Sequence, residues 1–561
     1  MSKTIKITLL FFGLFLGLYP LAAQSDNPVI NAIQKEVDRN MTSLKMEGMA
    51  PPFFISYSVF DRVDYTLSAS LGTISSTSEI HQRRGMPTLL VGNYHRNNLK
   101  VPERAFSPSS TTLIDNTTGV PITIWRDLDG VYKSSVETYR SKMAILQQQT
   151  QTQEEKDLPD FEQVKQVHMI AQPVSLNFNK AYWENYLRKV SETAKQYPDI
   201  LNSNVSLTAR SIMTYTYNTE GSRYTIPYTF YQLTFTANTR AEDGQDLSQT
   251  VYEENATFEQ MPDLVTFTNQ CKAVMENLLK LKNAHVVNDA YSGPVLFEGK
   301  ALYILFVQAF LSNNKLAAAP KLAQLPQSQS LIMVNGVLQL TSPQLGGNDF
   351  ELMLNKKVIS RDLSIKSITG QEFYNGKRLN GYYPIDAEGV VPAKELMLIE
   401  NGVLRNLLNG RKPTNNIRES NGHVRFDYNA NAYKVTAGNI HITCNQTFSN
   451  DELYKKLIAA AKEEDLEYAY IVRIMSGGDS FFYKVYVEDG REELVRGAAI
   501  SDATSLRPFK RILGASNIEQ IESYGFNQSS VISPNAILFE EMDITRLPNI
   551  EFKKPYIVPK P

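Results

Sequence analysis

Three polar residues lie in sequence contexts that could support chemistry. Asp386 and Glu388 are separated by one residue, so they could bind Ca²⁺ or act as paired carboxylates in acid–base catalysis. A solvated turn ahead of Gly389 is the more ordinary interpretation, and we favour it. His423 stands alone in a predicted loop, where a histidine is more often a hydrogen-bonded surface residue than a catalytic group. The elements around these candidates decide whether they meet.

Other kinds of active site are not indicated. The closest two of the six histidines are 14 residues apart, whereas a metal-binding helix needs a close pair. No Gly-x-Ser-x-Gly sequence occurs, and neither Cys271 nor Cys444 lies in a catalytic signature. The spacing of the cysteines leaves a disulfide open, and two buried thiols are the simpler expectation. Gly477-Gly478 is predicted to be a hairpin turn, because no helix start or Lys-Ser/Thr pair follows it.

The first half of the chain is predicted to mix helices with antiparallel strands. Apolar residues at helical spacing predict helices at 28–44, 134–158, 181–197 and 264–281. Alternating apolar residues predict strands at 53–59, 65–71, 88–91, 205–218 and 223–240. We expect the first two strands to form a hairpin that turns at 61–64. The last two are expected to pair, with a bulge where the alternation of apolar residues is imperfect.

The second half is predicted to be rich in strands. A helix at 300–311 precedes strand-like segments at 331–340, 350–365, 395–408, 468–475, 481–488 and 493–498. One further helix is predicted from 450 to about 463. Ser449 and Glu452 have the spacing of a capping box, in which each side chain binds a free backbone N–H at the start of the helix.

The composition is that of an ordinary folded protein. A chain of 561 residues is long enough for two or three domains with sizeable cores. Hydrophobic residues make up 42% and charged residues 21%, which excludes a disordered chain. The formal net charge is −2, so the chain lacks the basic field that would hold a phosphate backbone. We therefore expect no binding to nucleic acid.

The N-terminal segment has the pattern of a secretory signal. Lys3 and Lys6 precede an apolar run at 7–19, and two small residues, Ala22 and Ala23, follow it. The run is shorter than the roughly 20 residues that span a bilayer. We expect cleavage after Ala23, no transmembrane anchor in the mature chain, and export to the periplasm of a Gram-negative bacterium.

Four sequence blocks between residues 291 and 544 follow the order seen in a known family. They are Tyr291 to Glu298, Ile385 to Leu404, Ser420 to Arg425, and Ser530 to Ile544. In this order the chain resembles the TldD/PmbA family, also called modulators of DNA gyrase or TldD/TldE metalloprotease-like proteins. Better-known members of that family are zinc peptidases or their metal-free partners. The resemblance covers most of the chain, but its motifs lie in the second half.

The positions that the resemblance assigns to zinc carry no zinc ligands. The peptidase branch has His-Glu-x-x-x-His on its metal helix, and the aligned residues here are Phe297, Glu298 and Leu302. The branch also has a metal-binding Cys, and the aligned segment at 524–527 contains none. Zinc requires sulfur, imidazole or carboxylate donors, so the resemblance implies the metal-free TldE/PmbA-like branch, with no metal or cofactor. Glu298, the general base that the family implies, is then only a weak catalytic candidate, because no metal-bound water stands beside it.

These observations predict an α+β fold in two parts after the signal peptide. A domain of helices and antiparallel sheet is expected at 24–285, and a β-rich, TldD/PmbA-like domain at 286–561. The boundary is set by the change in element types near His285 and by the start of the family blocks. Residues 1–23 are expected to be the signal peptide.

Three functions from different classes are compatible with the sequence. The first is a non-catalytic subunit or homologue that binds extended peptides in a metallopeptidase complex, as a homo-oligomer or with a metal-bearing TldD-like partner. The second is an active hydrolase with a rebuilt carboxylate site that uses Glu298, Asp386 and Glu388. The third is a structural or carbohydrate-binding envelope protein. We favour the first, and whether the chain is an enzyme stays open.

Overall fold

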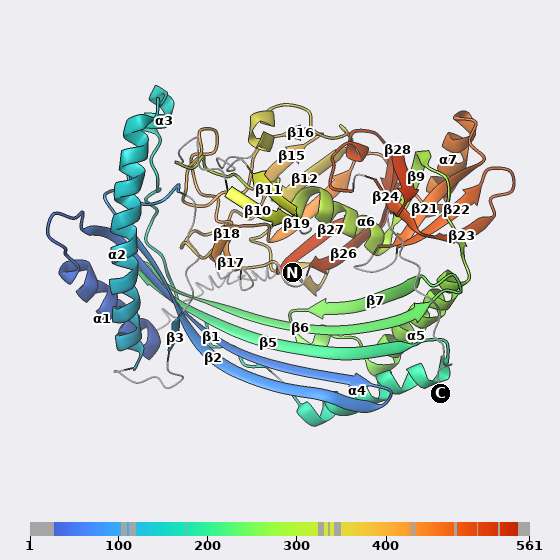
Figure 1. Ribbon diagram of the computed structural model, residues 1–561, viewed down its shortest axis with the longest axis horizontal. Helices are drawn as coiled ribbons and strands as arrows, with labels where there is room; N and C mark the ends of the chain where they lie inside the picture. Colours follow the sequence, from blue (N-terminus) through green and yellow to red (C-terminus); the bar gives the residue numbers. More distant parts are fainter. Residues whose placement is uncertain are drawn as a thin grey trace, which may run out of the picture.

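The computed structural model describes residues 27–101, 109–111, 119–176, 178–312, 314–323, 330–334, 337–341, 349–427, 432–475, 480–501, 503–524 and 528–547. A long curved sheet forms one side of the molecule, and a strand-rich body lies across its concave side (Figure 1). We call the curved sheet with its helices, up to Lys282, the N-terminal part, and the strand-rich body from His285 onward the C-terminal part. Both parts combine helices with sheets, so the predicted α+β fold is confirmed. None of the helices in the described ranges is long and apolar enough to span a membrane.

The curved sheet contains seven strands in the order β3-β2-β1-β5-β6-β4, with β7 paired to β6. Its strands are β1 (Pro52–Ser70), β2 (Thr73–Val91), β3 (Ser109–Thr111), β4 (His168–Met169), β5 (Asn202–Asn218), β6 (Arg223–Arg240) and β7 (Asp246–Asn255). All pairs are antiparallel except β4 with β6. A strand of 19 residues such as β1 extends for roughly 60 Å. The sheet is therefore long enough to underlie most of the second part.

The predicted hairpin at 61–64 is wrong. β1 runs through this segment without a turn, because the acidic residues that suggested one are paired across strands. Asp64 is 5% exposed, and its Oδ1 accepts a hydrogen bond from Nε of Arg210 on β5 at 2.6 Å. The chain turns at Leu71 and Gly72 instead, both with positive φ, which suits a tight two-residue hairpin turn.

The predicted bulge between β5 and β6 is also wrong, although the pairing itself is confirmed. The register is continuous from Asn202 opposite Asn238 to Tyr217 opposite Arg223. Apolar residues fail to alternate here because both faces of β6 are buried. Phe230 and Tyr231 are neighbours in sequence and point to opposite faces, and each is 3% exposed.

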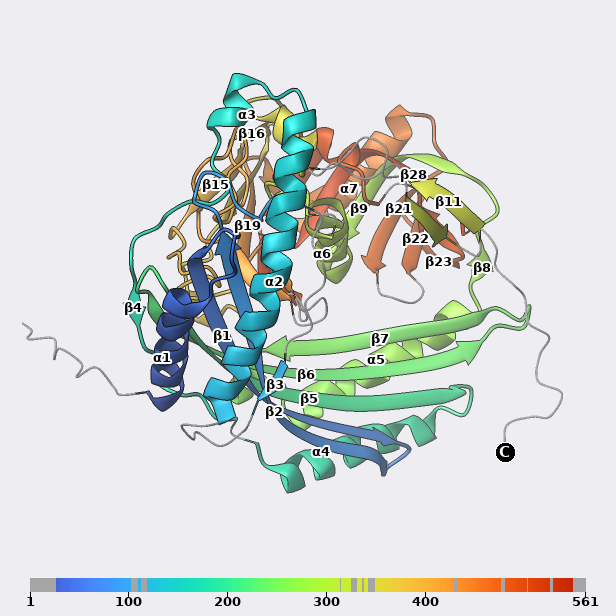
Figure 2. The ribbon, with the colours of Figure 1, turned by 60° about the vertical axis from the view of Figure 1, so that its left-hand side comes forward.

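Four helices pack on the convex face of the curved sheet. α1 (Pro28–Ser43) and α2 (Gly119–Gln148) cover one end, and α4 (Lys180–Glu192) and α5 (Leu264–Lys282) cover the other (Figures 1 and 2). Three of the predicted helices are confirmed. α2 begins 15 residues before the predicted start at 134, because Val120, Ile124, Leu128 and Tyr132 continue its buried stripe. It ends at Gln148, and α3 (Gln153–Asp157) follows as a separate turn.

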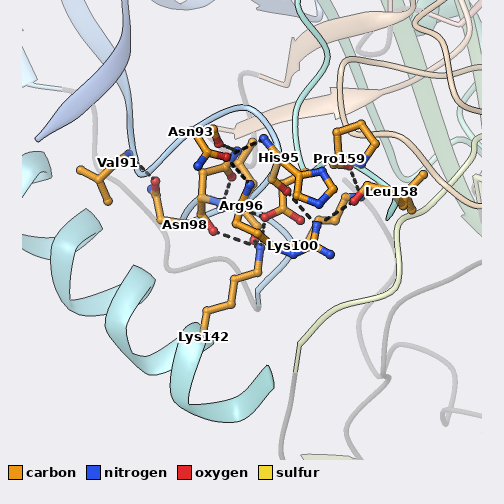
Figure 3. A network of polar contacts seen from close by, with 12 residues as sticks. Val91, Asn93, His95, Arg96, Asn98, Lys100, Lys142, Leu158 and Pro159 are labelled. Carbon is orange, nitrogen blue, oxygen red and sulfur yellow. Dashed lines mark hydrogen bonds and ion pairs between the residues drawn. The ribbon is translucent and has the colours of Figure 1, made fainter. Parts of the chain in front are cut away.

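The C-terminal end of α2 is tied to a neighbouring loop by buried lysines (Figure 3). Lys142 Nζ donates to the carbonyl oxygen of Asn97 at 3.0 Å and pairs with the carboxylate of Asp160. Lys100 Nζ donates to the carbonyl oxygen of Pro159 at 2.8 Å, and burial lowers the pKa of Lys100 to about 8. These contacts fix the upright position of α2 at the end of the sheet.

The C-terminal part contains two larger sheets. The nine-stranded sheet has the order β20-β25-β28-β9-β21-β22-β23-β8, with β24 paired to β28, and the six-stranded sheet has the order β16-β15-β12-β19-β27-β26. The first contains β8 (His285–Val286), β9 (Tyr291–Glu298), β20 (Thr447–Phe448), β21 (Tyr468–Ile474), β22 (Phe481–Tyr486), β23 (Glu492–Arg496), β24 (Ala498–Ile500), β25 (Ile512–Ser516) and β28 (Ala536–Arg546). The second contains β12 (Leu363–Ser367), β15 (Leu396–Glu400), β16 (Val403–Leu404), β19 (Asn439–Cys444), β26 (Glu519–Tyr524) and β27 (Ser529–Pro534).

Three short hairpins complete the strands of this part. They are β10 (Ser330–Val334) with β11 (Val337–Thr341), β13 (Phe373–Tyr374) with β14 (Lys377–Arg378), and β17 (Val424–Asp427) with β18 (Ala432–Val435). The predicted strand at 350–365 is mostly wrong. A short 3-10 helix, Asp349–Met353, and a loop precede β12, and Asn355 there has a positive φ that breaks an extended strand. The predicted turn at Gly477-Gly478 lies outside the described residues.

Two helices cover opposite faces of the nine-stranded sheet. α6 (Gly299–Phe306), continued by a π-turn at Val307–Leu311, is buried between the two sheets in the largest apolar core. α7 (Asn450–Glu463) packs on the other face. The predicted capping box of α7 is confirmed, because Ser449 and Glu452 each bind the other's backbone N–H.

Candidate functional site

Phe297 and Leu302 lie in the apolar core between the two sheets. Phe297, on β9, is 0% exposed and meets the ring of Phe539 edge to face, with centroids 5.6 Å apart. Leu302, on α6, is also 0% exposed in the same core. Both side chains therefore serve packing, and neither carries an atom that could bind a metal ion.

Glu298 points away from this core. Along β9 the side chains alternate, so Leu296 packs in the α7 core, Phe297 in the α6 core, and Glu298 again toward α7. Its Oε2 accepts a hydrogen bond from Nε of Arg473 at 2.8 Å. Arg473 also pairs with Glu492 at 2.6 Å, and the two carboxylates raise the pKa of the Arg473 guanidinium. The Glu298 carboxylate is thus one arm of an ion-pair network.

The segment aligned with the family's cysteine is only partly described. Tyr524 ends β26, and residues 525–527 lie outside the described residues. In the described ranges, no three His, Cys, Asp or Glu side chains gather in a way that could hold a metal ion. Cys271 and Cys444 are free thiols, the first buried in the α5 core and the second half-buried at the end of β19.

Asp386 is not in a solvated turn, and that expectation is wrong. The residue is 1% exposed, and its carboxylate accepts backbone N–H bonds from Glu388, Val390 and Val424 at 2.8–3.1 Å. Tyr224 of β6 lies against this loop, and its hydroxyl donates a hydrogen bond to the carbonyl oxygen of Ala387 at 3.0 Å. Burial and the Glu388 charge raise the pKa of Asp386 to about 7, against the opposing effect of the three N–H donors.

Glu388 belongs to a contact between the N-terminal and C-terminal parts. Its Oε2 accepts the backbone N–H of Arg411 at 2.7 Å. The Arg411 side chain is 0% exposed, pairs with Glu220 at 2.6 Å, and lies over the ring of Phe161 with 4.0 Å to the centroid. Its Nε also donates to the carbonyl oxygen of Glu162 at 2.9 Å. Asp386 and Glu388 therefore hold a loop in place, while Glu298 is engaged elsewhere with Arg473.

His423 is buried, so the prediction of a surface residue is wrong. It is 0% exposed, with Nε2 at 2.8 Å from Ser367 Oγ and Nδ1 at 2.8 Å from Asn421 Oδ1. Burial lowers the pKa of His423 to about 4, so the ring is neutral at physiological pH. A neutral ring between two fixed polar groups positions the loop after Ser420, and it is not the imidazolium that a general acid would need at pH 7.

A small cavity lies where these loops meet the concave face of the curved sheet. Its volume is about 50 Å³, enough for a few water molecules. Phe60 of β1 stacks on Phe426 of β17 with ring centroids 4.3 Å apart, and Tyr433 donates to Ser58 Oγ at 3.0 Å. These contacts close the junction between the two parts. Sequence reasoning missed this cavity, because Ser58 and Tyr433 are separated by 375 positions.

A second group of charged residues lies at the start of α6. Lys300 Nζ donates to the carbonyl oxygen of Tyr252 at 3.0 Å and is 3.7 Å from Glu253 Oε1 on β7. Glu254, the next residue on β7, and Glu522 of β26 interact electrostatically with Lys300. The sequence offered a signal for this group, because Lys300 stands within the degenerate motif and Glu253 and Glu254 are adjacent.

Comparison with known proteins bears on this architecture. Residues 329–546 match a family model described as the PmbA/TldA metallopeptidase C-terminal domain. This match assigns residues 329–546 to a domain of the TldD/PmbA family. The resemblance inferred from the four sequence blocks is confirmed. No curated protein sequence matches the chain.

Several solved structures share the fold of most of the chain. A putative modulator of a DNA gyrase from Thermotoga maritima has 16% identity and a TM-score of 0.58, with 91% of this chain and 100% of that chain covered. TldE from Thermococcus kodakarensis has 13% identity and a TM-score of 0.54, with 92% and 100% covered. A putative modulator of DNA gyrase from Bacteroides thetaiotaomicron has 12% identity and a TM-score of 0.55, with 92% and 98% covered. At these identities the likeness is one of fold.

The residues of this chain do not fit a zinc ion at the family's position. Phe297 and Leu302 supply no donor atoms and are part of the core. Glu298 faces the α7 side of the nine-stranded sheet and is bound to Arg473. A carboxylate held by a guanidinium, on the other side of the sheet from α6, is not placed to activate water beside that helix.

Proposed function

We propose that this chain is a non-catalytic, zinc-free member of an exported metallopeptidase complex. In this role it holds extended peptides and completes the binding chamber of a metal-bearing TldD-like homologue. The proposal rests on the residues that occupy the family's metal-binding positions. Phe297 and Leu302 are core residues, and Glu298 is paired with Arg473. Hydrolysis of an amide requires an activated nucleophile and stabilisation of the developing oxyanion, and zinc would supply both.

The rest of the fold supports a retained structural role. α6 remains buried between the two sheets, and its apolar residues continue the core through the π-turn. A helix kept with its packing but without ligands suits a subunit that contributes shape. The alternative of a rebuilt carboxylate site gains no support, because Asp386 and Glu388 bind backbone N–H groups while Glu298 binds Arg473.

Peptide binding is proposed from the position of β26. This strand is the last of the six-stranded sheet, and within the described ranges it pairs only with β27. The outer edge of a strand offers backbone donors and acceptors to an extended peptide. Export to the periplasm completes the proposal, and the signal-like pattern of residues 1–23 supports it.

The test is co-expression with an exported homologue from the same host that keeps His-Glu-x-x-x-His. We expect the two chains to co-purify, the mixed complex to cleave unfolded peptides, and the present chain alone to show no cleavage. The substitution Glu298→Gln in this chain is expected to leave the activity of the mixed complex nearly unchanged. The matched control, Glu to Gln in the partner's motif, is expected to abolish it. Loss of cleavage from Glu298→Gln while the complex stays assembled would show that Glu298 is catalytic.

A further inference from the structure

The start of α6 lies between a strand of the N-terminal part and a strand of the C-terminal part. β7 and β26 pack against each other, and α6 lies beside both (Figure 1). Gln520 of β26 donates from Nε2 to the carbonyl oxygen of Gly299, the first residue of α6, at 3.0 Å. Lys300 reaches from the same turn to the carbonyl oxygen of Tyr252 on β7. Three elements thus converge on one polar junction.

Glu254 brings an unsatisfied carboxylate oxygen to this junction. The residue is 8% exposed, and its Oε1 accepts a hydrogen bond from Nε2 of Gln232 on β6. Its Oε2 is buried and has no hydrogen-bond partner among the described residues. Leaving a buried acceptor unsatisfied costs free energy, and burial raises the pKa of Glu254 to about 7. Among the described residues, no donor therefore reaches Oε2 of Glu254.

The surrounding charges leave the junction rich in acceptors. Glu253 and Glu522 act on Glu254 as like charges, and Lys300 opposes them. The contacts of Lys300 Nζ go to the carbonyl oxygen of Tyr252 and to Glu253. Lys377 also acts on Glu522 as an opposite charge. Among the described residues these carboxylates do not form a metal-binding group, so a cationic hydrogen-bond donor suits the junction better than a metal ion.

We propose that Glu254 and Glu522 bind the primary ammonium group of an extended peptide. An ammonium has three N–H donors and one positive charge, so it matches both the unsatisfied oxygen and the surplus of carboxylates. The site uses one residue from each part of the chain, as expected for a ligand held between them. This inference rests on the proposed peptide binding and names the group that is recognised.

The ammonium has two sources, the amino terminus of a peptide or a lysine side chain. Four fluorescent probes separate them when titrated by anisotropy against the full mature chain: a Gly-Ala pentapeptide with a free amino terminus, the same peptide acetylated, and acetylated peptides with one lysine or one norleucine. We expect the free pentapeptide, the acetylated lysine peptide, or both, to bind at least about tenfold more tightly than their uncharged counterparts.

Three variants test the residues. Glu254→Gln and Glu522→Gln keep the side-chain shape, and each is expected to weaken binding of the charged probe by about tenfold. Glu259→Gln, at an exposed position before α5, is the matched control and is expected to leave binding unchanged. Lys300→Met removes the competing cation and is expected to tighten binding, which a merely structural role of the carboxylates would not produce. Thermal unfolding of each variant checks that it is folded.

The outcomes separate this inference from the proposed function. If charged and uncharged probes bind equally well, peptide binding stands and ammonium recognition is wrong. If no probe binds, both are wrong. If the charged probe binds but folded Glu254→Gln and Glu522→Gln bind it as tightly as the parent chain, the ammonium is bound elsewhere and the site assigned here is wrong.

Discussion

His423 and Asp386 lie in segments that the sequence presents as loops, yet the fold removes both from water. His423 is held neutral between Ser367 and Asn421, and burial lowers its pKa to about 4. Asp386 is held by three backbone N–H groups, and burial raises its pKa to about 7. At the scale of single residues, burial and local donors decide the charge of each group more than residue type does.

The buried histidine predicts an acid-sensitive contribution to stability. An unfolded histidine has a pKa near 6.5, so between pH 6.5 and 4 the unfolded chain binds a proton that folded His423 does not. Lowering the pH from 7 to 4 should therefore remove up to about 3 kcal/mol of unfolding free energy through this residue. Urea unfolding at pH 7 and pH 5 should show a smaller loss of stability for His423→Gln than for the parent chain.

The pH dependence of the parent chain alone would not isolate His423, because Asp386 changes the unfolding free energy in the opposite direction. Its raised pKa lets the folded chain keep a proton that the unfolded chain releases between about pH 4 and pH 7, so acidification stabilises the fold through Asp386. The exposed His95→Gln is the control and should follow the parent chain at both pH values. Equal pH dependence of the His423→Gln and parent chains would contradict the assignment.

A second prediction at this scale concerns metal. The purified chain should retain no stoichiometric zinc after dialysis, because Phe297 and Leu302 offer no ligand and Glu298 is bound to Arg473. Restoring the motif with Phe297→His and Leu302→His should destabilise the core, not create a site, because two imidazoles would be buried among apolar side chains. Elemental analysis of both proteins measures the bound zinc, and about one zinc per parent chain would overturn the prediction of a zinc-free protein.

Local signals and tertiary packing together decide the elements, and packing prevails where the two conflict. In α7 the local signal suffices, because the capping box, the buried stripe of Leu453, Leu457 and Ala461, and the acidic first turn all favour the same helix. In β1 they conflict, since acidic residues at 61–64 suggest a turn while neighbouring strands supply arginines for them. The strand forms because pairing on both sides satisfies its backbone as well as its charges.

The cap of α7 gives a prediction for a single element. Ser449→Ala removes the side-chain oxygen that accepts the backbone N–H of Glu452 at 3.3 Å, and should lower the unfolding free energy by about 1 kcal/mol. Ser134→Ala, at an exposed position within α2, is the matched control and should change it by less than about 0.5 kcal/mol. Urea denaturation measures both, and equal effects would mean that the cap adds no stability.

The whole molecule depends on contacts between parts that are remote in sequence. The curved sheet holds the C-terminal part across its concave side (Figure 2), and the hydrogen bond from Tyr224 to Ala387 and the stacking of Phe60 on Phe426 join the two. Arg411 is a fully buried charge at this junction, with its guanidinium over the rings of Phe54 and Phe161.

Arg411 should therefore be critical for the joined molecule. Arg411→Met removes the guanidinium that pairs with the Glu220 carboxylate, which is only 8% exposed and also accepts from the Tyr94 hydroxyl, and should cost roughly 3–5 kcal/mol. Because the contact joins the two parts, we expect thermal unfolding to separate into two transitions. Arg405→Met breaks an exposed pair with Glu400 and should cost less than about 1 kcal/mol. A single transition with unchanged midpoint in Arg411→Met would contradict this role.

The sequence by itself determined the features that depend on near neighbours. The buried stripes of α1 and α5, the pairing of β5 with β6 across a four-residue turn, and the capping box of α7 follow from residues within a few positions of one another. The resemblance to the TldD/PmbA family followed from the order of four sequence blocks, without coordinates. Phe297 and Leu302, at the family's ligand positions, already excluded the expected ligands.

Only the tertiary structure decided what the candidate residues do. Glu298 pairs with Arg473 from 175 positions away, and Arg411 binds the carbonyl oxygen of Glu162 from 249 positions away. Which face of β9 Glu298 occupies depends on how α6 and α7 pack around the nine-stranded sheet, and the burial of Asp386 and His423 depends on β6 and β12 closing over their loops. No local sequence pattern marks such long-range contacts. The partner can be any polar residue of suitable shape that the packing of the chain brings close.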